Sequence, residues 1–130
     1  MPIEVKTLRC SADPRGWLFE PLDDEELARQ RNVHVVMTRP GQVRGNHVHH
    51  RTTEWLSVAG PALVRVRVEG EVQDYSVPGG EAHRFTIPPE VAHAIRNTGT
   101  EWGLCVSFTD QVHDPAQPDV SRYPLLEPTH

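Results

Sequence analysis

The chain has 130 residues, 37% of them hydrophobic, and a formal net charge of −5. This length fits one domain over residues 1–130, and the negative charge argues against a surface for nucleic acid or anionic membrane. Twelve prolines and nine glycines favour many short strands over long helices. No apolar run approaches the roughly 18 residues of a membrane span, no signal-peptide pattern opens the chain, and the two cysteines have no CxxC partner, so a cytoplasmic protein is expected.

The first third of the chain predicts two strands with one short helix between them in sequence. Ile3–Leu8 alternates in polarity and predicts an edge strand, and Asp13–Gly16 has the chemistry of a turn. Pro21–Arg31 carries acidic residues early and basic residues late, which suits the helix dipole. Asn32–Thr38 is rich in β-branched residues and predicts a strand, which Arg39–Gly41 ends.

The rest of the chain predicts strands separated by turns. Ala62–Glu69 has the clearest alternation, and together with Val72–Val77 it predicts a hairpin. The other expected strands are Arg44–His49, Glu54–Ala59, His83–Ile87, Val91–Arg96 and Trp102–Phe108. From about residue 110 the chain is rich in Pro and Asp, and this tail is expected to run over the surface or onto a partner subunit. About nine or ten strands and one helix predict an all-β barrel or sandwich.

Eight histidines are more than a core of this size needs, and three of them suggest a site. His47 and His49 point to the same face of a strand because side chains alternate. Glu54 follows five residues later, and His93 supplies a further imidazole. Such a donor set suits Zn, Ni, Fe, Mn or Co. With all four ligands a zinc site would be closed and structural, whereas an open position would make it catalytic.

The spacing of these residues resembles two motifs of the cupin superfamily, which are double-stranded β-helix barrels of the jelly-roll class. The segments are Gly41-x5-His47-x-His49-x4-Glu54-x5-Gly60 and Pro88-x4-His93-x3-Asn97. The resemblance implies that His47, His49 and Glu54 bind a divalent metal inside the barrel together with His93, zinc being the first choice. Two departures fall in turns: the gap before Gly60 is one residue short, and Glu90 stands where the second motif has Gly.

Two further segments resemble dTDP-4-dehydrorhamnose 3,5-epimerase-like cupins. Asp13-x-Arg15-Gly16 with Phe19-Glu20 is similar to that family's DxRGxFxE start, and Arg44-Gly45-Asn46-His47 is similar to its RGLH motif. In that family the arginine of RGLH meets the nucleotide diphosphate and the histidine is the base. The resemblance therefore implies substrate binding by Arg44 and Arg15 and makes His47 a candidate base.

A closer resemblance is to the C-terminal cupin domain of bifunctional UDP-sugar epimerase-reductases of capsular polysaccharide synthesis. It covers Asp13–Asp119 through the segments TRPGQVRGNHVHHRTTEWLSVAGPALVRVR, IPPEVAHAIRNTG and HDPAQPD. It implies an epimerase or isomerase acting on a 4-keto-6-deoxy nucleotide sugar in polysaccharide or glycosylated-metabolite biosynthesis, and a homodimer. Those relatives carry a separate reductase domain, so at most the cupin half of their activity can apply.

A 4-keto sugar has acidified protons next to its carbonyl, and epimerisation needs a base, a group that stabilises the enolate, and a proton donor. A histidine meets the first need and a metal or fixed cation the second. His47 cannot be ligand and free base at once. If it binds metal, the proton shuttle would be His83, His34, Tyr75 or a metal-bound water.

Other interpretations remain open at the level of sequence. Arg67 could line a substrate cavity, although an exposed strand face is the simpler interpretation, and His34 shares a strand face with Val36 and Thr38. The chain could instead be a metal-dependent cupin of another class, such as a dioxygenase or polyketide cyclase. It could also be a non-catalytic module that binds a sugar or a metal.

Overall fold

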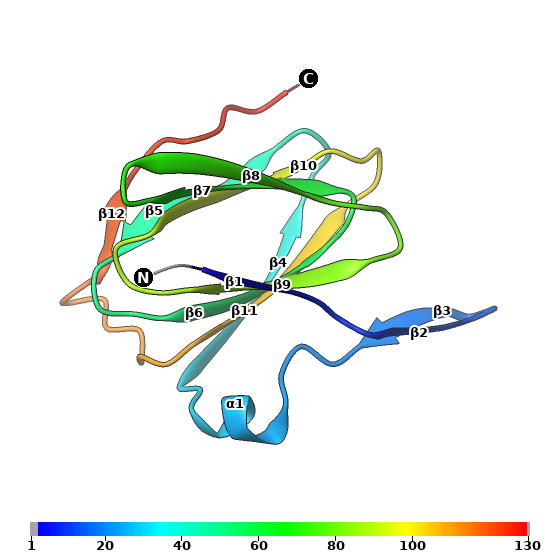
Figure 1. Cartoon of the computed structure of the whole chain (residues 1–130), viewed down its shortest axis with the longest axis horizontal. Coiled ribbons are helices and arrows are strands. Elements are labelled where there is room, and N and C mark those ends of the chain that lie inside the picture. The colour runs from blue at the N-terminus through cyan, green and yellow to red at the C-terminus, as the bar shows by residue number, and fades with distance from the viewer. Residues whose placement is uncertain (1–2, 130) are drawn as a thin grey trace.

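Two antiparallel five-stranded sheets face each other in the computed structural model, which describes residues 3–129 (Figure 1). One sheet has the order β1-β9-β6-β11-β4, the other has the order β12-β5-β10-β7-β8, and β2 with β3 forms a separate hairpin. The strands are β1 (Glu4–Thr7), β2 (Cys10–Asp13), β3 (Gly16–Phe19), β4 (Asn32–Thr38), β5 (Val43–His49), β6 (Glu54–Ala59), β7 (Ala62–Val68), β8 (Glu71–Val77), β9 (Ala82–Ile87), β10 (Ala92–Asn97), β11 (Gly103–Thr109) and β12 (Val120–Arg122). Sheet neighbours are mostly not consecutive in the chain, as in a jelly roll, so the expected cupin fold is confirmed.

The β7–β8 hairpin shows how the alternating pattern becomes structure. Glu69 and Gly70 both have positive φ, +50° and +83°, as a two-residue turn of type I′ requires. This turn fixes the register in which Val64 lies opposite Tyr75. Val64 and Val66 are then fully buried between the sheets, while Arg65 and Arg67 lie on the outer face.

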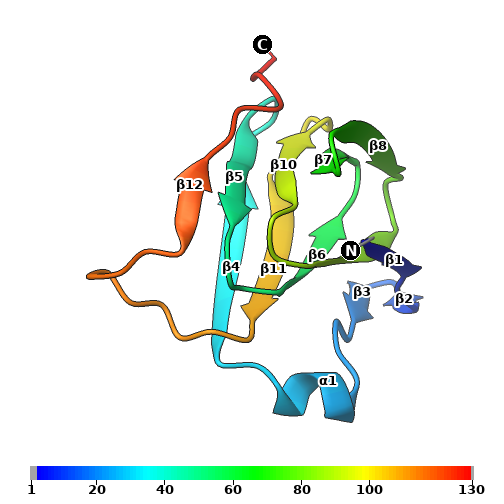
Figure 2. The same ribbon diagram turned by 60° about the vertical axis from the view of Figure 1, so that its left-hand side comes forward.

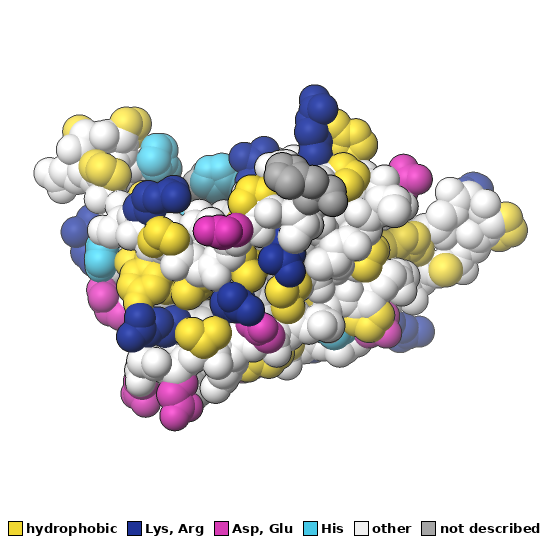
Figure 3. Space-filling model, turned by 90° about the horizontal axis from the view of Figure 1, so that it is seen from above, with side chains coloured by type: hydrophobic (Ala, Val, Ile, Leu, Met, Phe, Trp, Pro, Cys, Tyr) yellow, Lys and Arg dark blue, Asp and Glu magenta, His cyan; other side chains and the backbone are white. Residues whose placement is uncertain are grey.

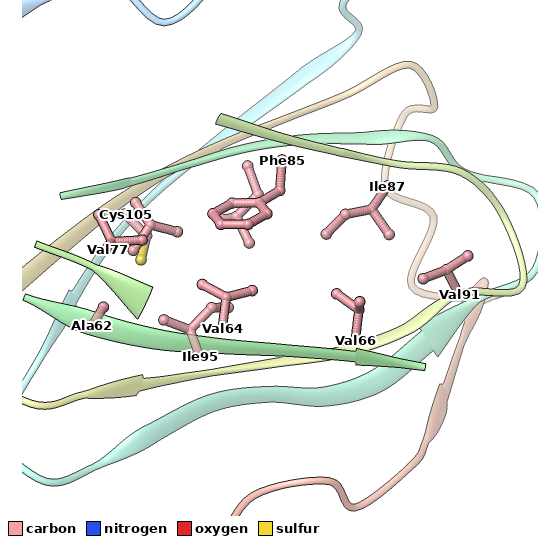
Figure 4. Packing of buried hydrophobic residues seen from close by; sticks show 11 residues of the cluster. Ala62, Val64, Val66, Val77, Phe85, Ile87, Val91, Ile95 and Cys105 are labelled. Atoms are coloured by element: carbon pink, nitrogen blue, oxygen red, sulfur yellow. The ribbon is translucent and has the colours of Figure 1, made fainter. Parts of the chain in front are cut away.

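The apolar core fills one half of the space between the sheets (Figure 4). Phe85 and Ile87 from β9 meet Val64 and Val66 from β7, and Ile95 of β10 packs beside them. The other half of the space lies between β4 and β11 on one side and β5 on the other, and its lining combines polar side chains with apolar ones that also belong to the core cluster, such as Ile95.

The single helix, α1 (Asp24–Ala28), is shorter than the predicted Pro21–Arg31. Asp23 accepts a hydrogen bond from the backbone N–H of Glu26, and the Glu26 side chain binds the Asp23 N–H, so a capping box sets where the helix begins. The helix lies on the outer side of the first sheet (Figure 1). There Arg84 is buried and pairs with Glu26 at 2.7 Å.

Two elements differ from the expectation. The Asp13–Gly16 turn joins two strands, β2 and β3, into a hairpin that projects from the barrel (Figure 1). Most of its residues are exposed, including Trp17 and Leu18, so it shows little alternation in burial. Figure 3 shows the molecule from above, with the hairpin at one end and basic and acidic side chains interspersed over this face.

The Pro-rich tail also contains a strand that was not expected, β12, which pairs with β5 (Figure 2). Three residues are too few for a recognisable alternation, and β12 exists because the edge of β5 offers it hydrogen-bonding groups. Among residues 3–129, no helix reaches the length and apolarity needed to cross a bilayer.

Candidate active site

Four side chains from three strands converge in the polar half of the barrel. His47 and His49 come from β5, Glu54 begins β6 in the opposite sheet, and His93 comes from β10, which is paired with β5. His93 lies directly opposite His47 in this pairing. One ligand atom from each residue lies within 4.8 Å of those of the others, so the structure brings together all four predicted metal ligands.

A bulge in β5 places the two histidine-bearing strands in close contact. Gly45 has φ of +89°, Asn46 has φ of +58°, and the register of β5 against β10 shifts between His93 and Ala94. A Cβ atom on Gly45 would lie 2.8 Å from the His93 carbonyl oxygen, so glycine is required here. The glycine of the RGNH segment therefore serves the close approach of His47 to His93.

The spacing of the ligand atoms fits one metal ion. Glu54 Oε1 lies 2.8 Å from His93 Nε2 and 3.6 Å from His49 Nε2, and His93 Nε2 lies 3.2 Å from His47 Nε2. Atoms bound to one zinc ion at its usual bond lengths lie about 3.0–3.6 Å apart. Glu54 Oε1 is buried and, apart from these imidazoles, has no hydrogen-bond partner among the described residues. A cation would satisfy this oxygen.

Neighbouring groups hold two of these ligands in the orientation that metal binding needs. The carbonyl of Val91 accepts a hydrogen bond from His93 Nδ1 at 3.1 Å, which leaves the lone pair of Nε2 facing the cluster when the ring is neutral. Ser107 Oγ donates to Glu54 Oε2 at 2.5 Å and leaves Oε1 for the centre. Such partners orient metal ligands and tune their basicity.

Electrostatics favours a neutral His47 and an ionised Glu54. Burial, reinforced by the nearby His93, lowers the pKa of His47 to about 4, and burial also lowers the pKa of His49. Burial alone would raise the pKa of Glu54, but the charge and hydrogen bonding of His93 outweigh it and bring that pKa to about 2. These are the protonation states in which such groups bind metal.

His93 differs from the other two histidines. Burial acts to lower its pKa, but the adjacent Glu54 carboxylate outweighs burial and raises it. Without a metal, His93 and Glu54 therefore form a buried ion pair. Metal binding would displace the proton on His93 Nε2, so it would be coupled to proton release.

The cluster lies in a cavity of about 340 Å³ between the two sheets. His34 of β4 is exposed and lines the cavity from the sheet opposite β5, and Arg44 of β5 lines the cavity as well. The remaining wall is largely apolar and includes Val36, Leu56, Ile95 and Cys105. The space combines ligand atoms, one cation and one further histidine, as an active site requires.

Two predicted substrate-binding arginines lie outside this cavity. Arg15 is at the tip of the projecting hairpin, where it pairs with Asp13 at 2.6 Å. Arg67 lies on the outer face of β7 and donates to the hydroxyl of Tyr123. Its strand alternates, and Val66 and Val68 occupy the inward positions around it.

Tyr75 and His83, predicted as alternative proton shuttles, also lie outside the cavity. The Tyr75 ring packs on Phe85, with ring centroids 5.6 Å apart, and its hydroxyl donates to Gln73. His83 lies opposite Val58, which is four residues along β6 from Glu54, a separation of roughly 13 Å. It interacts there with Glu81 at 2.9 Å.

Some residues of the site were not anticipated from the sequence. Ser107 holds Glu54, and Thr109 lines the cavity beside it on β11. The sequence contains a pattern that could have indicated them, because Cys105, Ser107 and Thr109 alternate with apolar residues along this strand. Alternation marks two faces of a strand, however, and does not say that the more polar face points inward.

Comparisons with known proteins agree with this geometry. A 30% identical relative is UDP-2-acetamido-2,6-beta-L-arabino-hexul-4-ose reductase of Pseudomonas aeruginosa, and the match covers 83% of this chain and 29% of that protein. The probable low-salt glycan biosynthesis epimerase Agl13 of Haloferax volcanii is 25% identical, over 94% of this chain and 86% of that protein. Among solved structures, the capsular polysaccharide assembling protein CapF of Staphylococcus aureus superposes with a TM-score of 0.68 at 28% identity, over 91% of this chain and 34% of that one.

The chain thus spans about a third or less of the Pseudomonas and Staphylococcus proteins, but most of the Haloferax one. The family model described as the polysaccharide biosynthesis C-terminal domain matches residues 11–121. This match includes all four clustered side chains. The chain belongs to the polysaccharide biosynthesis C-terminal domain family.

Proposed function

We propose that the protein is a nucleotide-sugar epimerase or isomerase that acts on a 4-keto-6-deoxy hexose in polysaccharide or glycan biosynthesis. The observation that carries this proposal is the cavity itself, where His34 and Arg44 flank a cluster of metal-ligand type. Family membership and the epimerase name of the similarly sized Haloferax relative support it. The reaction removes a proton next to the keto group and returns it on the other face or at another carbon.

The cluster fits a divalent metal ion, with zinc the first choice for three imidazoles and one carboxylate. His49, Glu54 and His93 would hold it together with His47, whose Nε2 is directed at His93 Nε2. When bound, the ion would supply positive charge that stabilises the oxygen of the enolate. Nickel, iron, manganese and cobalt suit the same donors.

His34 is our candidate for the base. His47 directs its Nε2 into the cluster, so as a ligand it cannot also accept the sugar proton. Of the three side chains that are alternatives to a metal-bound water, His34, Tyr75 and His83, the first alone lines the cavity. A histidine is suited to accept and return a proton near neutral pH.

Arg44 is our candidate for binding the diphosphate of the substrate. Within residues 3–129 no carboxylate lies within ion-pair distance of its guanidinium, which donates only a long hydrogen bond to the Met37 carbonyl at 3.5 Å. A guanidinium can donate two parallel hydrogen bonds to a phosphate. The sugar would then lie between Arg44 and the cluster, with its 6-methyl group against the apolar wall.

Incubation of the purified protein with UDP- and dTDP-linked 4-keto-6-deoxy sugars in D2O tests the function. Deuterium should appear at the carbons next to the keto group. His34→Gln should slow its incorporation by about 10²- to 10⁴-fold, whereas His83→Gln, the matched control, should not. Absence of incorporation with both nucleotides would reject the proposal. A loss in His83→Gln but not in His34→Gln would reject the assignment of the base.

We also propose that the protein is a cytoplasmic homodimer. The outer face of β4 exposes Val33, Val35 and Met37, and the projecting hairpin exposes Trp17 and Leu18, so each copy offers apolar surfaces that a second copy could cover. The free thiols fit a reducing compartment. Light scattering should give twice the mass of the chain for the wild type and a lower mass for Val35→Asp; a wild-type monomer would contradict the dimer.

A further inference from the structure

The tail motif HDPAQPD, residues 113–119, has no role in the chemistry proposed above. The structure shows where its segment goes: after β11 the chain loops outward and returns as β12 along the free edge of β5 (Figure 2). In this pairing Val120 lies opposite His49, and Arg122 lies opposite His47. The tail thus pairs with the strand that carries two of the clustered histidines.

Asp119, the last residue of the motif, binds the loop that joins His49 to Glu54. Its Oδ2 accepts hydrogen bonds from Thr52 Oγ1 at 2.6 Å and from the Arg51 backbone N–H at 2.9 Å. Its carbonyl oxygen accepts another from the His50 N–H at 3.1 Å. Thr52 is buried, so at least one of these contacts is shielded from water.

The start of the tail binds the last residue of the same loop. Asp110 Oδ1 accepts a hydrogen bond from the Thr53 N–H at 3.0 Å, and the Asp110 N–H donates to the Thr53 carbonyl at 3.3 Å. The loop, residues 50–53, contains no helix or strand and crosses from one sheet to the other. Hydrogen bonds to the tail therefore determine its path.

We propose that Asp119 is a positioning residue for the histidine–glutamate cluster, and that it acts by fixing the loop that separates His49 from Glu54. This rests on the metal site of the proposed function. The two residues come from different sheets, and their ligand atoms are 3.6 Å apart. A loop free to move would let this distance change, and metal affinity depends strongly on such outer contacts.

The motif supplies its own control. Asp114 is also an aspartate of HDPAQPD, but its Oδ1 accepts a hydrogen bond from the Ala116 N–H, inside the tail itself. Within residues 3–129 its side chain makes no hydrogen bond or ion pair with loop 50–53. Asp114→Ala should therefore remove a similar carboxylate without changing the path of the loop.

The test is a titration of the metal-free full-length chain with Co²⁺, followed by the absorbance of the bound ion. We expect Asp119→Ala to weaken Co²⁺ binding by about 10- to 100-fold and to change the absorbance spectrum. Asp119→Asn should restore most of the affinity, because its amide oxygen can still accept from Thr52 and Arg51. Asp114→Ala should match the wild type.

A second variant covers the case in which Asp119→Ala does not fold. Thr52→Val keeps the shape of the side chain but removes the hydroxyl donor, so it should weaken Co²⁺ binding in the same direction by a smaller factor. Folded Asp119→Ala and Thr52→Val proteins with wild-type affinity and spectrum would overturn the proposal. Lack of stoichiometric Co²⁺ binding by the wild type would overturn it together with the metal site. Co²⁺ binding that falls as expected in a protein without deuterium exchange would support it while rejecting the epimerase.

Discussion

Strands β7 and β4 show the same alternation in sequence and opposite placement in the barrel. In β7 the apolar residues Val64 and Val66 point inward and are fully buried. In β4 the more polar face, with His34 and Thr38, is turned toward the interior, and Val35 on the other face is 67% exposed. The strands belong to different halves of the space between the sheets: β7 borders the apolar core, and β4 borders the cavity.

This difference in placement means that one half of the space between the sheets stabilises the fold and the other half contains the candidate site. The filled half buries Phe85, Ile87 and their neighbours, and this burial is the main favourable term in folding. The hollow half contains a buried ion pair between His93 and Glu54, whose desolvation is costly. We infer that the filled half offsets this cost and gives the cavity a rigid wall.

The largest effect on stability should come from removing a large side chain from the apolar core in the filled half. Phe85→Ala removes a fully buried ring and should lower the free energy of unfolding by about 3–5 kcal/mol, as measured by urea denaturation. The folded variant should still bind Co²⁺ with wild-type affinity. Leu27→Ala, at an exposed helix position, is the control and should change stability by less than about 0.5 kcal/mol. Loss of metal affinity in folded Phe85→Ala would show that the two halves are not separable.

A change in the hollow half should weaken metal binding strongly and lower stability only slightly. Ser107→Ala removes the donor to Glu54 Oε2, so the carboxylate loses the contact that directs Oε1 toward the centre. Calorimetric titration with Zn²⁺ should show affinity reduced by about 10- to 100-fold, with a loss in stability of about 1 kcal/mol. Ser76→Ala, on β8 at an exposed position, is the matched control. Unchanged zinc affinity in Ser107→Ala would mean that this hydrogen bond does not orient the ligand.

Much of the fold was predictable from local pattern. Asn32–Thr38 and Glu54–Ala59 are strands with the predicted bounds, because each run is followed by residues typical of turns, Pro40-Gly41 and Gly60-Pro61. The hairpin β2–β3 and strand β12 were not predicted as strands. β12 is specified by pairing with the distant edge of β5, which no local window contains.

Part of the site was predictable for a different reason. His47, His49, Glu54 and His93 were found by spacing and resemblance, and Glu90, which replaces the usual glycine, has φ of +70°, a conformation glycine adopts readily. The sequence could not say that Tyr75 and His83 lie far from the cluster. Their strand positions point inward, but only the strand pairing, β9 with β6 for His83 and β8 with β7 for Tyr75, shows how far along the barrel they lie.

A smaller effect is expected in the pH dependence of the metal-free protein. The pKa of His47 falls from an ordinary 6.5 to about 4 on folding because the ring is buried near His93. Between these values the unfolded chain binds a proton there and the folded chain does not, so His47 makes the protein less stable as pH falls from 6.5 toward 4. His47→Gln should remove this part of the dependence.

Thermal unfolding in EDTA at pH 7 and at pH 5 measures this effect. The fall in melting temperature between the two pH values should be smaller in His47→Gln than in the wild type. His113→Gln, in the exposed tail, is the control and should behave as the wild type. An equal fall in His47→Gln would mean that His47 is protonated to the same extent in the folded and unfolded states.

The smallest effect should be found at Cys105, which lies where the two halves meet. It belongs to the apolar core cluster and also lines the cavity, and burial raises the pKa of its thiol to about 12. At pH 8 about one thiol in ten thousand is then ionised, and the thiolate is the reactive form. Iodoacetamide should therefore modify Cys10 in the native protein and leave Cys105 unmodified, as read by mass spectrometry of the digested chain. In urea both cysteines should react, which shows that the iodoacetamide is active. Rapid modification of Cys105 in the folded protein would mean that burial does not suppress the ionisation of this thiol.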